Sequence, residues 1–368
     1  MGMARVRRIR TPVGDEAWLV SGHAEVRRLY ADRRLGRTHP DPAAAARLGD
    51  HQLLSASELY SHEHEHEEHM AIRAALMPFF GGRRMAVLRE SVRGLLAELL
   101  DELAAAGPGA DLHSMLSAPL SVRTLCALLG VPDREVFRDL VDQMDDVQDR
   151  ARAEAGQAEL SAYLTEVVEL RRTSPDDGVL AGLAAAGLST EDIAGIATML
   201  LFAGYDSTAV MIDAGVLLLT RHRDQWELLR VRPDAVPGAV EEVLRLGDAD
   251  AADGSGIARY ARESIEIDGV TIEAGEAVVL DTARANLDER AFAEPLRFDP
   301  GRSPNPQLAF GHGPWHCLGA PLARLQLIEV FTALPARFPG LRLGIPDGEL
   351  AMTGNLFTGR VRRLPVRW

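Results

Sequence analysis

The chain has 368 residues, 46% of them hydrophobic, so it is long enough to bury a large core. Its formal net charge of -14 provides no basic field for nucleic acid or an anionic membrane, and we expect neither as a partner. Two cysteines are too few for a disulfide framework, and we expect no apolar run of about 18 residues that would span a bilayer. These features predict a cytoplasmic protein.

Most of the chain has helical periodicity. The first long helix is expected over residues 85–107, where the apolar pattern stops at Gly107 and Pro108. A second, over residues 188–222, has Ser189 as its N-cap and acidic residues in its first turn. At roughly 30 residues it is far longer than the average globular helix. Further helices are expected over residues 120–130, 158–172 and 235–246.

Strand-like alternation is confined to short segments. Residues 263–272 alternate on both sides of the turn dipeptide Asp268-Gly269, and residues 276–283 form a second candidate strand. The chain shows no internal repeat and no long low-complexity linker. The pattern predicts one mainly α domain with small β-sheets over residues 1–368.

The segment FGHGPWHCLG, residues 310–319, carries the clearest chemical signal. Its glycines permit positive φ and let the backbone approach a flat ligand. The residues after Cys317 have helical spacing, so the sulfur is expected at a helix N-terminus, where a thiolate is favoured. A thiolate held on such a loop suits the fifth coordination position of an iron porphyrin, where it favours O–O cleavage. Cys126, within LCALLG, is more typical of a small buried hydrophobic residue.

FGHGPWHCLGAPLAR, residues 310–324, resembles the haem-binding loop and following helix of the cytochrome P450 superfamily, bacterial soluble type. Similar motifs occur in the family's order over the rest of the chain, from about residue 14 onward. The resemblance implies the cytochrome P450 fold with a short N-terminus, and haem b as cofactor. The other motifs are HMAIR (69–73), AGYDST (203–208), AVEEVLRL (239–246), ARYARESIEIDG (258–269) and EPLRFDP (294–300).

The resemblance assigns Cys317 as the axial ligand of the haem iron. Within AGYDST, a mid-helix glycine costs about 1 kcal/mol against alanine, and Gly204 would open a groove for dioxygen. Asp206 would deliver protons together with a hydroxyl, either Ser207 or Thr208, and alignment favours Ser207. Without the other motifs, close helix packing with Asp206 facing solvent would explain the same segment.

The resemblance also implies a structural ion pair and a set of haem contacts. Glu242 and Arg245, at E-x-x-R spacing, would form the pair, and Arg297 would complete it. The family usually has a basic residue two positions before the cysteine, where this chain has Trp315, whose indole donates one hydrogen bond but brings no charge. The expected haem-binding residues are His69, Arg73, Arg259, Phe310, Gly311, Trp315, His316 and Gly319.

The substrate side is less determined. The acidic segment LGDADAADGSGIARY (246–260) indicates a polar or cationic substrate or, more simply, a solvated loop. For SHEHEHEEHM (61–70), a solvated loop leading into the helix of His69 is favoured over a metal site. The expected pocket residues are Phe202, Ala203, Ile257, Leu356 and Phe357.

The predicted activity is that of a monooxygenase that oxidises a small organic molecule with O2, in bacterial secondary metabolism. The resemblance implies electrons from NAD(P)H through a ferredoxin and its reductase, docking near Arg302 and Arg324. The substrate would arrive free or tethered to a carrier protein. Two alternatives stay open: a haem enzyme of this fold with another reaction (peroxide-driven oxidation, coupling or dehydration), and a non-catalytic accessory protein.

Overall fold

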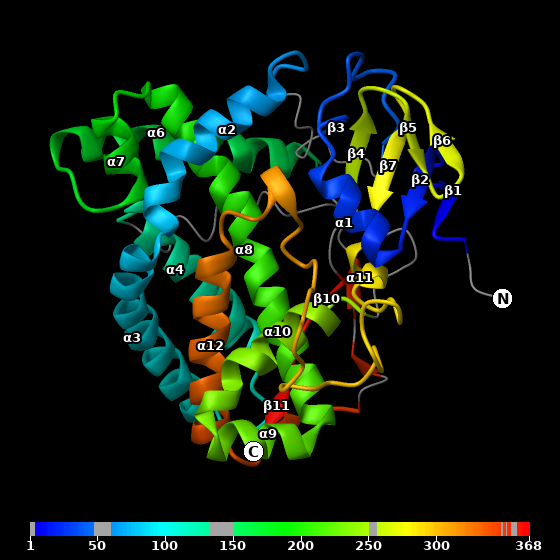
Figure 1. Cartoon of the computed structure of the whole chain (residues 1–368). Coiled ribbons are helices and arrows are strands. Elements are labelled where there is room, and N and C mark those ends of the chain that lie inside the picture. Colours follow the sequence, from blue (N-terminus) through cyan, green and yellow to red (C-terminus); the bar gives the residue numbers. More distant parts are fainter. Residues whose placement is uncertain are drawn as a thin grey trace. The chain divides into compact units, whose positions relative to one another are not determined.

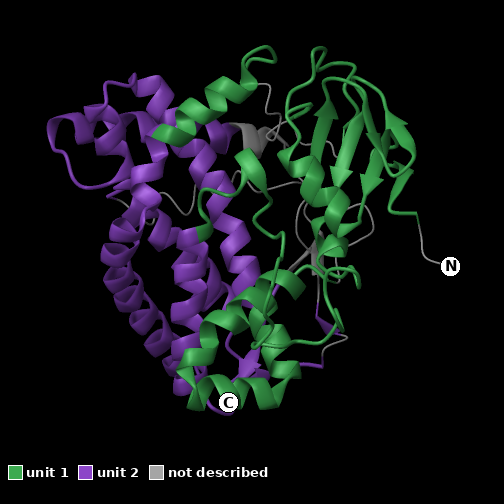
Figure 2. Cartoon of the chain, in the orientation of Figure 1, with its two compact units in different colours: residues 1–74, 214–320, 352–360 green, residues 75–213, 321–351, 361–368 purple. Residues whose placement is uncertain are grey.

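The computed structural model describes residues 4–47, 60–132, 150–249, 256–346, 349–350, 352–354 and 359–368 (Figure 1). The chain divides into two compact units (Figure 2). Unit 1 comprises residues 1–74, 214–320 and 352–360, and unit 2 comprises residues 75–213, 321–351 and 361–368. A single domain over residues 1–368 stays a prediction.

Unit 1 is built on a five-stranded sheet in the order β1-β2-β7-β4-β3. The β2–β7 pair is parallel, with Trp18 opposite Val278, and the other pairs are antiparallel. Side chains alternate between the two faces, and α1 (His23–Ala31) packs on the face that carries Trp18. The strands are β1 (Val6–Arg10), β2 (Glu16–Val20), β3 (Leu35–Gly36), β4 (Ile257–Ala261) and β7 (Ala277–Leu280).

The predicted hairpin is confirmed. Strands β5 (Ile265–Ile267) and β6 (Val270–Ile272) pair across Asp268 and Gly269, whose φ angles are 49° and 79°. Two consecutive positive φ angles form the turn that matches strand twist, and an Asp-Gly dipeptide adopts them with little strain. The helices of unit 1 are α2 (Glu65–Leu76, which continues two residues into unit 2), α9 (Arg223–Val231), α10 (Val236–Leu246) and α11 (Thr282–Ala285), with 3-10 turns η5 (Pro233–Ala235) and η6 (Gly313–Trp315).

Unit 2 is helical, and the predicted helices are confirmed. Helix α3 (Gly82–Ala106) ends at Gly107, whose φ is 80°, and α8 (Thr190–Arg221) begins where the Ser189 hydroxyl accepts the Asp192 amide at 3.0 Å. The other helices are η3 (Met77–Phe80), the π-turn η4 (His113–Ser117), α4 (Ala118–Leu129), α6 (Arg150–Thr173), α7 (Val179–Ala185) and α12 (Ala320–Arg337). A short ladder pairs β8 (Arg342–Leu343) with β11 (Val366–Arg367). A second ladder pairs β9 (Met352–Gly354) with β10 (Gly359–Val361) and belongs to unit 1 except for its last residue.

Helix α8 bears on the expectation that no apolar run of the chain would span a bilayer. Within the described ranges, it alone is long and apolar enough to cross a membrane, with a window of mean hydropathy 1.4 that is 44% buried. Its polar contacts are those of a core helix. Asp213, only 1% exposed, accepts hydrogen bonds at 2.6 Å from the Ser117 hydroxyl and from Nδ1 of His113. A buried carboxylate satisfied by two neighbours from the same unit belongs to a protein interior.

Replacing Asp213 with alanine is expected to lower the free energy of unfolding by about 2–4 kcal/mol, because Ser117 and His113 lose their buried acceptor. At neutral pH, Asp213→Asn should lower the free energy of unfolding by less than Asp213→Ala does. Burial raises the pKa of Asp213, so the folded protein holds this proton to higher pH than the unfolded chain does. The stability advantage of wild type over Asp213→Asn should therefore decline as pH rises from about 4. Urea titrations between pH 4 and 7 measure this, and a difference that grows with pH would contradict it.

Candidate active site

The loop around Cys317 lies in unit 1. The Cys317 amide donates to the Phe310 carbonyl at 2.8 Å and closes the loop, and the Cys317 side chain is exposed. Helix α12 begins three residues later, so the predicted position of the sulfur ahead of a helix is confirmed. Gly319 lacks the positive φ predicted for it, but a Cβ there would lie 3.8 Å from the Cys317 sulfur.

Two glycines of the loop permit close contact with α1. Gly311 and Gly313 each have a φ of 69°, as predicted. A Cβ at Gly313 would lie 3.0 Å from the Ala31 Cα, and one at Gly311 would lie 3.4 Å from the Tyr30 ring. Larger residues would therefore both strain the backbone and push the loop off the helix.

Trp315, two residues before the cysteine, is the centre of an aromatic and cationic cluster in unit 1. Its ring stacks on His69 with centroids 3.8 Å apart and 27° between the planes, and Tyr60 meets it edge-on at 6.3 Å. The guanidinium carbons of Arg37 and Arg259 lie 4.6 and 5.7 Å from the indole centroid. The structure thus brings together three of the predicted haem-binding residues and adds Arg37, which the sequence analysis missed.

Burial strongly affects the charges in this cluster. Arg259 is 4% exposed, and burial, reinforced by the charge of Arg37, lowers its pKa to about 9. Burial also lowers the pKa of Arg37. The pKa of His69 falls to about 4, mainly through burial, so its imidazole is neutral at pH 7. Neighbouring cations with little water around them favour binding of an anion.

Arg73 and His316, also predicted to bind haem, contact each other, and this contact ties the Cys317 loop to α2. Nη1 of Arg73, on α2, donates to the His316 carbonyl at 2.7 Å, and Nε2 of His69 lies 3.3 Å from the Pro314 carbonyl. The His316 ring packs near the Phe310 ring at 6.3 Å. The order Trp315-His316 therefore directs the indole toward the cations and the imidazole toward Phe310.

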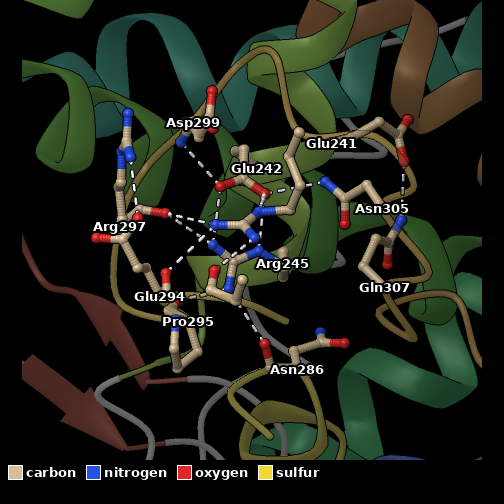
Figure 3. A network of polar contacts seen from close by, with 12 residues as sticks. Glu241, Glu242, Arg245, Asn286, Glu294, Pro295, Arg297, Asp299, Asn305 and Gln307 are labelled. Carbon is tan, nitrogen blue, oxygen red and sulfur yellow. Dashed lines mark hydrogen bonds and ion pairs between the residues drawn. The ribbon is translucent and has the colours of Figure 1, made fainter. Parts of the chain in front are cut away.

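Glu242 and Arg245 form the predicted ion pair in the core of unit 1 (Figure 3). Both side chains are fully buried, and Nε and Nη2 of Arg245 donate to the two carboxylate oxygens at 2.7 and 2.8 Å. Arg245 also donates to three backbone carbonyls, those of Asn286, Pro295 and Arg297, at 3.2, 2.5 and 3.0 Å. The pair thereby fixes the chain from α11 to the loop that precedes Cys317.

The assignment of Arg297 as the third charged member was wrong. Its side chain is 61% exposed and pairs with Glu294, and only its carbonyl joins the network. Arg302 takes the place instead, donating from Nε to Glu242 at 3.2 Å with a side chain 10% exposed. Asn305 and the Asp299 amide, each at 2.9 Å, complete the shell of Glu242. The same contacts rule out Arg302 as an exposed docking residue.

The AGYDST motif lies on α8 in unit 2. Gly204 packs closely against a neighbouring helix, as the alternative interpretation of this segment expected, because a Cβ there would lie 3.0 Å from Leu125 of α4. Ser207 is exposed, and its hydroxyl donates to the Ala203 carbonyl at 2.9 Å, whereas Thr208 is 6% exposed and faces the interior. Asp206 is partly exposed on the same helix. Of the two hydroxyls, Ser207 is therefore the accessible one.

The remaining predicted positions are scattered. Phe202 and Ala203 are exposed on α8, and Ile257, at the start of β4, is 37% exposed. Leu356 and Phe357 lie outside the described residues. Arg324 is partly buried on α12 in unit 2.

The histidine-rich segment becomes helical earlier than expected, because α2 starts at Glu65. Glu65 is 1% exposed and accepts the Arg37 amide at 2.6 Å and the Thr38 hydroxyl at 2.7 Å. It therefore anchors the chain that follows β3, which a solvated loop would not do. In the part of the chain that the structure describes, no three His, Cys, Asp or Glu groups are placed to hold a metal ion.

Comparison with known proteins decides the family. The family model described as Cytochrome P450 matches residues 234–339. Pentalenolactone synthase of Streptomyces exfoliatus is 38% identical over 98% of this chain and 92% of its own length. The chain belongs to the cytochrome P450 family. The mycinamicin IV hydroxylase/epoxidase of Micromonospora griseorubida is 37% identical to this P450 over 99% of the chain and 92% of its own length.

Solved structures agree with this assignment. The substrate-free P450 PimD, a pimaricin epoxidase, superposes with a TM-score of 0.91 at 41% identity, covering 99% of this chain and 93% of its own. A mutant of the mixed-function P450 MycG in complex with mycinamicin IV gives a TM-score of 0.88 at 35% identity. The match covers 100% of this chain and 94% of the MycG chain. The predicted fold class is confirmed.

This P450 is a haem-thiolate monooxygenase that uses O2 and electrons from a redox partner, as predicted. Its relatives do not support the accessory-protein alternative, because they are named as hydroxylases, epoxidases and monooxygenases. The described residues fit the cofactor. Among them, no carboxylate lies within ion-pair distance of Arg37 or Arg259, and none of them provides a hydrogen-bond partner for the buried Nε atom of Arg37. Haem carries two carboxylates that such cations bind well.

Proposed function

We propose that Cys317 is the thiolate ligand of the haem iron in an O2-dependent hydroxylase or epoxidase of a bacterial secondary metabolite. The supporting observation is the exposed Cys317 on a closed loop, beside a cluster of cations that lack carboxylate partners among the described residues. When bound, haem supplies the O2 and one-electron chemistry. The chain's own residues orient it, exclude water and move protons.

Proton delivery is proposed for Asp206 and Ser207. A positioned acid accelerates proton transfer only if it exchanges protons with solvent or a neighbouring hydroxyl, and both side chains are accessible on α8. The Ser207 hydroxyl donates to a carbonyl of its own helix, which leaves its oxygen lone pairs available to accept a hydrogen bond from water. Thr208 points into the interior and does not share this access.

The proposed substrate class follows from the relatives. By their names, they oxidise mycinamicin IV and the polyene macrolide pimaricin or form pentalenolactone. A small organic secondary metabolite, free or tethered to a carrier protein, is the class we propose for this enzyme. A ferredoxin and its NAD(P)H-dependent reductase are the proposed electron donors, and the cytoplasm is the proposed location, since both partners and NAD(P)H are found there.

The deciding experiment is turnover with isotopically labelled dioxygen. Haem-loaded enzyme, a ferredoxin, its reductase and NADPH are incubated with a panel that includes polyene macrolides and mycinamicins, preselected by the spin-state change that a substrate causes on displacing iron-bound water. One labelled oxygen atom in the product, dependent on NADPH, supports the proposal. Unlabelled product, or product formed only with peroxide, would favour the alternative reaction on the same fold.

Replacing Ser207 with alanine is expected to reduce product per NADPH consumed about a hundredfold, because proton delivery loses its hydroxyl. NADPH and oxygen consumption should continue, with peroxide released instead of product. Thr208→Val is the matched control and should keep the wild-type yield. If Thr208→Val loses coupling and Ser207→Ala does not, the roles of the two hydroxyls are reversed.

A further inference from the structure

Arg37 is a largely desolvated cation that no acid among the described residues neutralises. It follows β3, and its backbone amide is fixed by the carboxylate of Glu65 at 2.6 Å. Its side chain is only partly exposed, and its Nε atom is buried with no hydrogen-bond partner in the part of the chain that the structure describes. Within the described ranges, no carboxylate lies within ion-pair distance of the guanidinium. Glu65, the nearby acid, is already occupied by two amides and a hydroxyl of the segment it anchors.

Arg259 repeats this arrangement beside it. At 4% exposed, its guanidinium makes one hydrogen bond among the described residues, to the carbonyl of its own neighbour Ala258 at 2.7 Å. Both guanidinium groups face the ring of Trp315, so the two like charges repel each other, and this repulsion adds to burial in lowering the pKa of Arg259. Burying two like charges side by side costs several kcal/mol per ion unless an anion joins them.

The indole of Trp315 cannot provide that compensation. Both guanidinium carbons lie within 6 Å of its centroid, which is cation–π distance. Such a contact contributes about 0.5–2 kcal/mol, less than the desolvation of a single guanidinium. The indole also stacks on the neutral ring of His69, which brings no charge. Trp315 therefore orients the two cations without neutralising them.

The position of Trp315 explains why a cation is needed from elsewhere. It lies two residues before the proposed iron ligand, where a charged side chain would project from the same loop toward the same space. An indole there leaves one haem carboxylate without a charged donor from the loop. Arg37 reaches the same indole from a different segment, the end of β3.

We propose that Arg37 binds a haem carboxylate in this enzyme, supplying the charge that the loop lacks at Trp315, and that Trp315 is the positioning surface for its guanidinium. The inference rests on the proposed function, because it takes Cys317 as the iron ligand. It also predicts that the two positions are interchangeable as sources of charge. The substitution Trp315→Arg, which places a permanent charge on the loop, should therefore make Arg37 dispensable.

The test is the rate of haem loss to excess apomyoglobin. Arg37→Met keeps most of the apolar stem and should lose haem about tenfold to a hundredfold faster than wild type, as expected for one lost charge-assisted hydrogen bond. The matched control is Arg33→Met, an exposed arginine four residues earlier, which should behave as wild type. The double variant Arg37→Met/Trp315→Arg should recover most of the retention.

The haem midpoint potential gives a second readout. It should fall in Arg37→Met, because losing a positive charge near the haem favours the ferric over the ferrous state. It should return toward the wild-type value in the double variant. A purely structural role of Arg37 would not produce this paired fall and return.

Unfolding of the haem-free protein separates this role from a structural one. Removing a buried cation without an anionic partner should leave the apoprotein as stable as wild type or more stable, while haem retention falls. Equal loss of apoprotein stability and haem retention would overturn the proposal, as would wild-type retention in Arg37→Met or no recovery in the double variant. Wild-type protein that binds no haem, or binds it without a thiolate spectrum, would instead overturn the proposed function.

Discussion

The Cys317→Ala protein is expected to lose the strongly red-shifted Soret band that reduced wild type gives under carbon monoxide, and with it all O2-dependent turnover. The band arises from a thiolate opposite carbon monoxide, and alanine has no ligand atom to replace it. The exposed sulfur on a loop closed by the Phe310 carbonyl contributes little to packing, so the fold should survive the change. Circular dichroism of both proteins checks that it does.

Cys126→Ala is the matched control. This sulfur is 1% exposed within α4, so its loss should lower stability modestly and leave the spectrum unchanged. A Cys317→His variant adds a positive readout, because an imidazole can still bind iron and should shift the band to that of a nitrogen ligand. A red-shifted band that persists in Cys317→Ala would refute the assignment of the ligand.

Local patterns allowed the helices and the hairpin to be predicted, because their signals lie within a few residues. Gly107 ends α3 and Ser189 caps α8 as expected, and Asp268-Gly269 forms the predicted turn. Strands β1 and β2 were missed. Strand β2 pairs with β7, more than 250 residues away in sequence, and β1 joins the sheet only through β2. Propensity carries no information about such a partner.

Residues of the candidate site could be predicted where a sequence motif identifies them. They could not be predicted where only burial determines which of several residues takes part. The spacing of Glu242 and Arg245 identified the ion pair, but two nearby arginines, Arg297 and Arg302, could each have completed it. Only the fold shows that one is 61% exposed and the other 10%. Arg37 was missed for a related reason, because no motif links the end of β3 to a tryptophan nearly 280 residues later.

The largest effect on stability is expected for Glu242→Ala. The substitution leaves Arg245 charged and fully buried and removes the acceptor for Arg302, Asn305 and the Asp299 amide. Breaking a buried pair from one side costs about 3–5 kcal/mol, a large part of the roughly 5–15 kcal/mol that stabilises a typical domain. Soluble yield and urea unfolding at about 25 °C measure the loss. Arg297→Ala, which removes an exposed partner of Glu294, should leave stability close to that of wild type.

Removing both charges tests what the pair holds together. In many proteins a buried ion pair can be replaced by apolar residues at little cost. Here Glu242→Leu/Arg245→Met should recover only part of the loss, because the carbonyls of Asn286, Pro295 and Arg297 also lose their donor and stay buried. Full recovery of stability would mean that the loss in Glu242→Ala came only from leaving the buried Arg245 charge unpaired. Partial recovery, with haem bound poorly, would show that Arg245 stabilises the fold chiefly by fixing the chain that leads to Cys317.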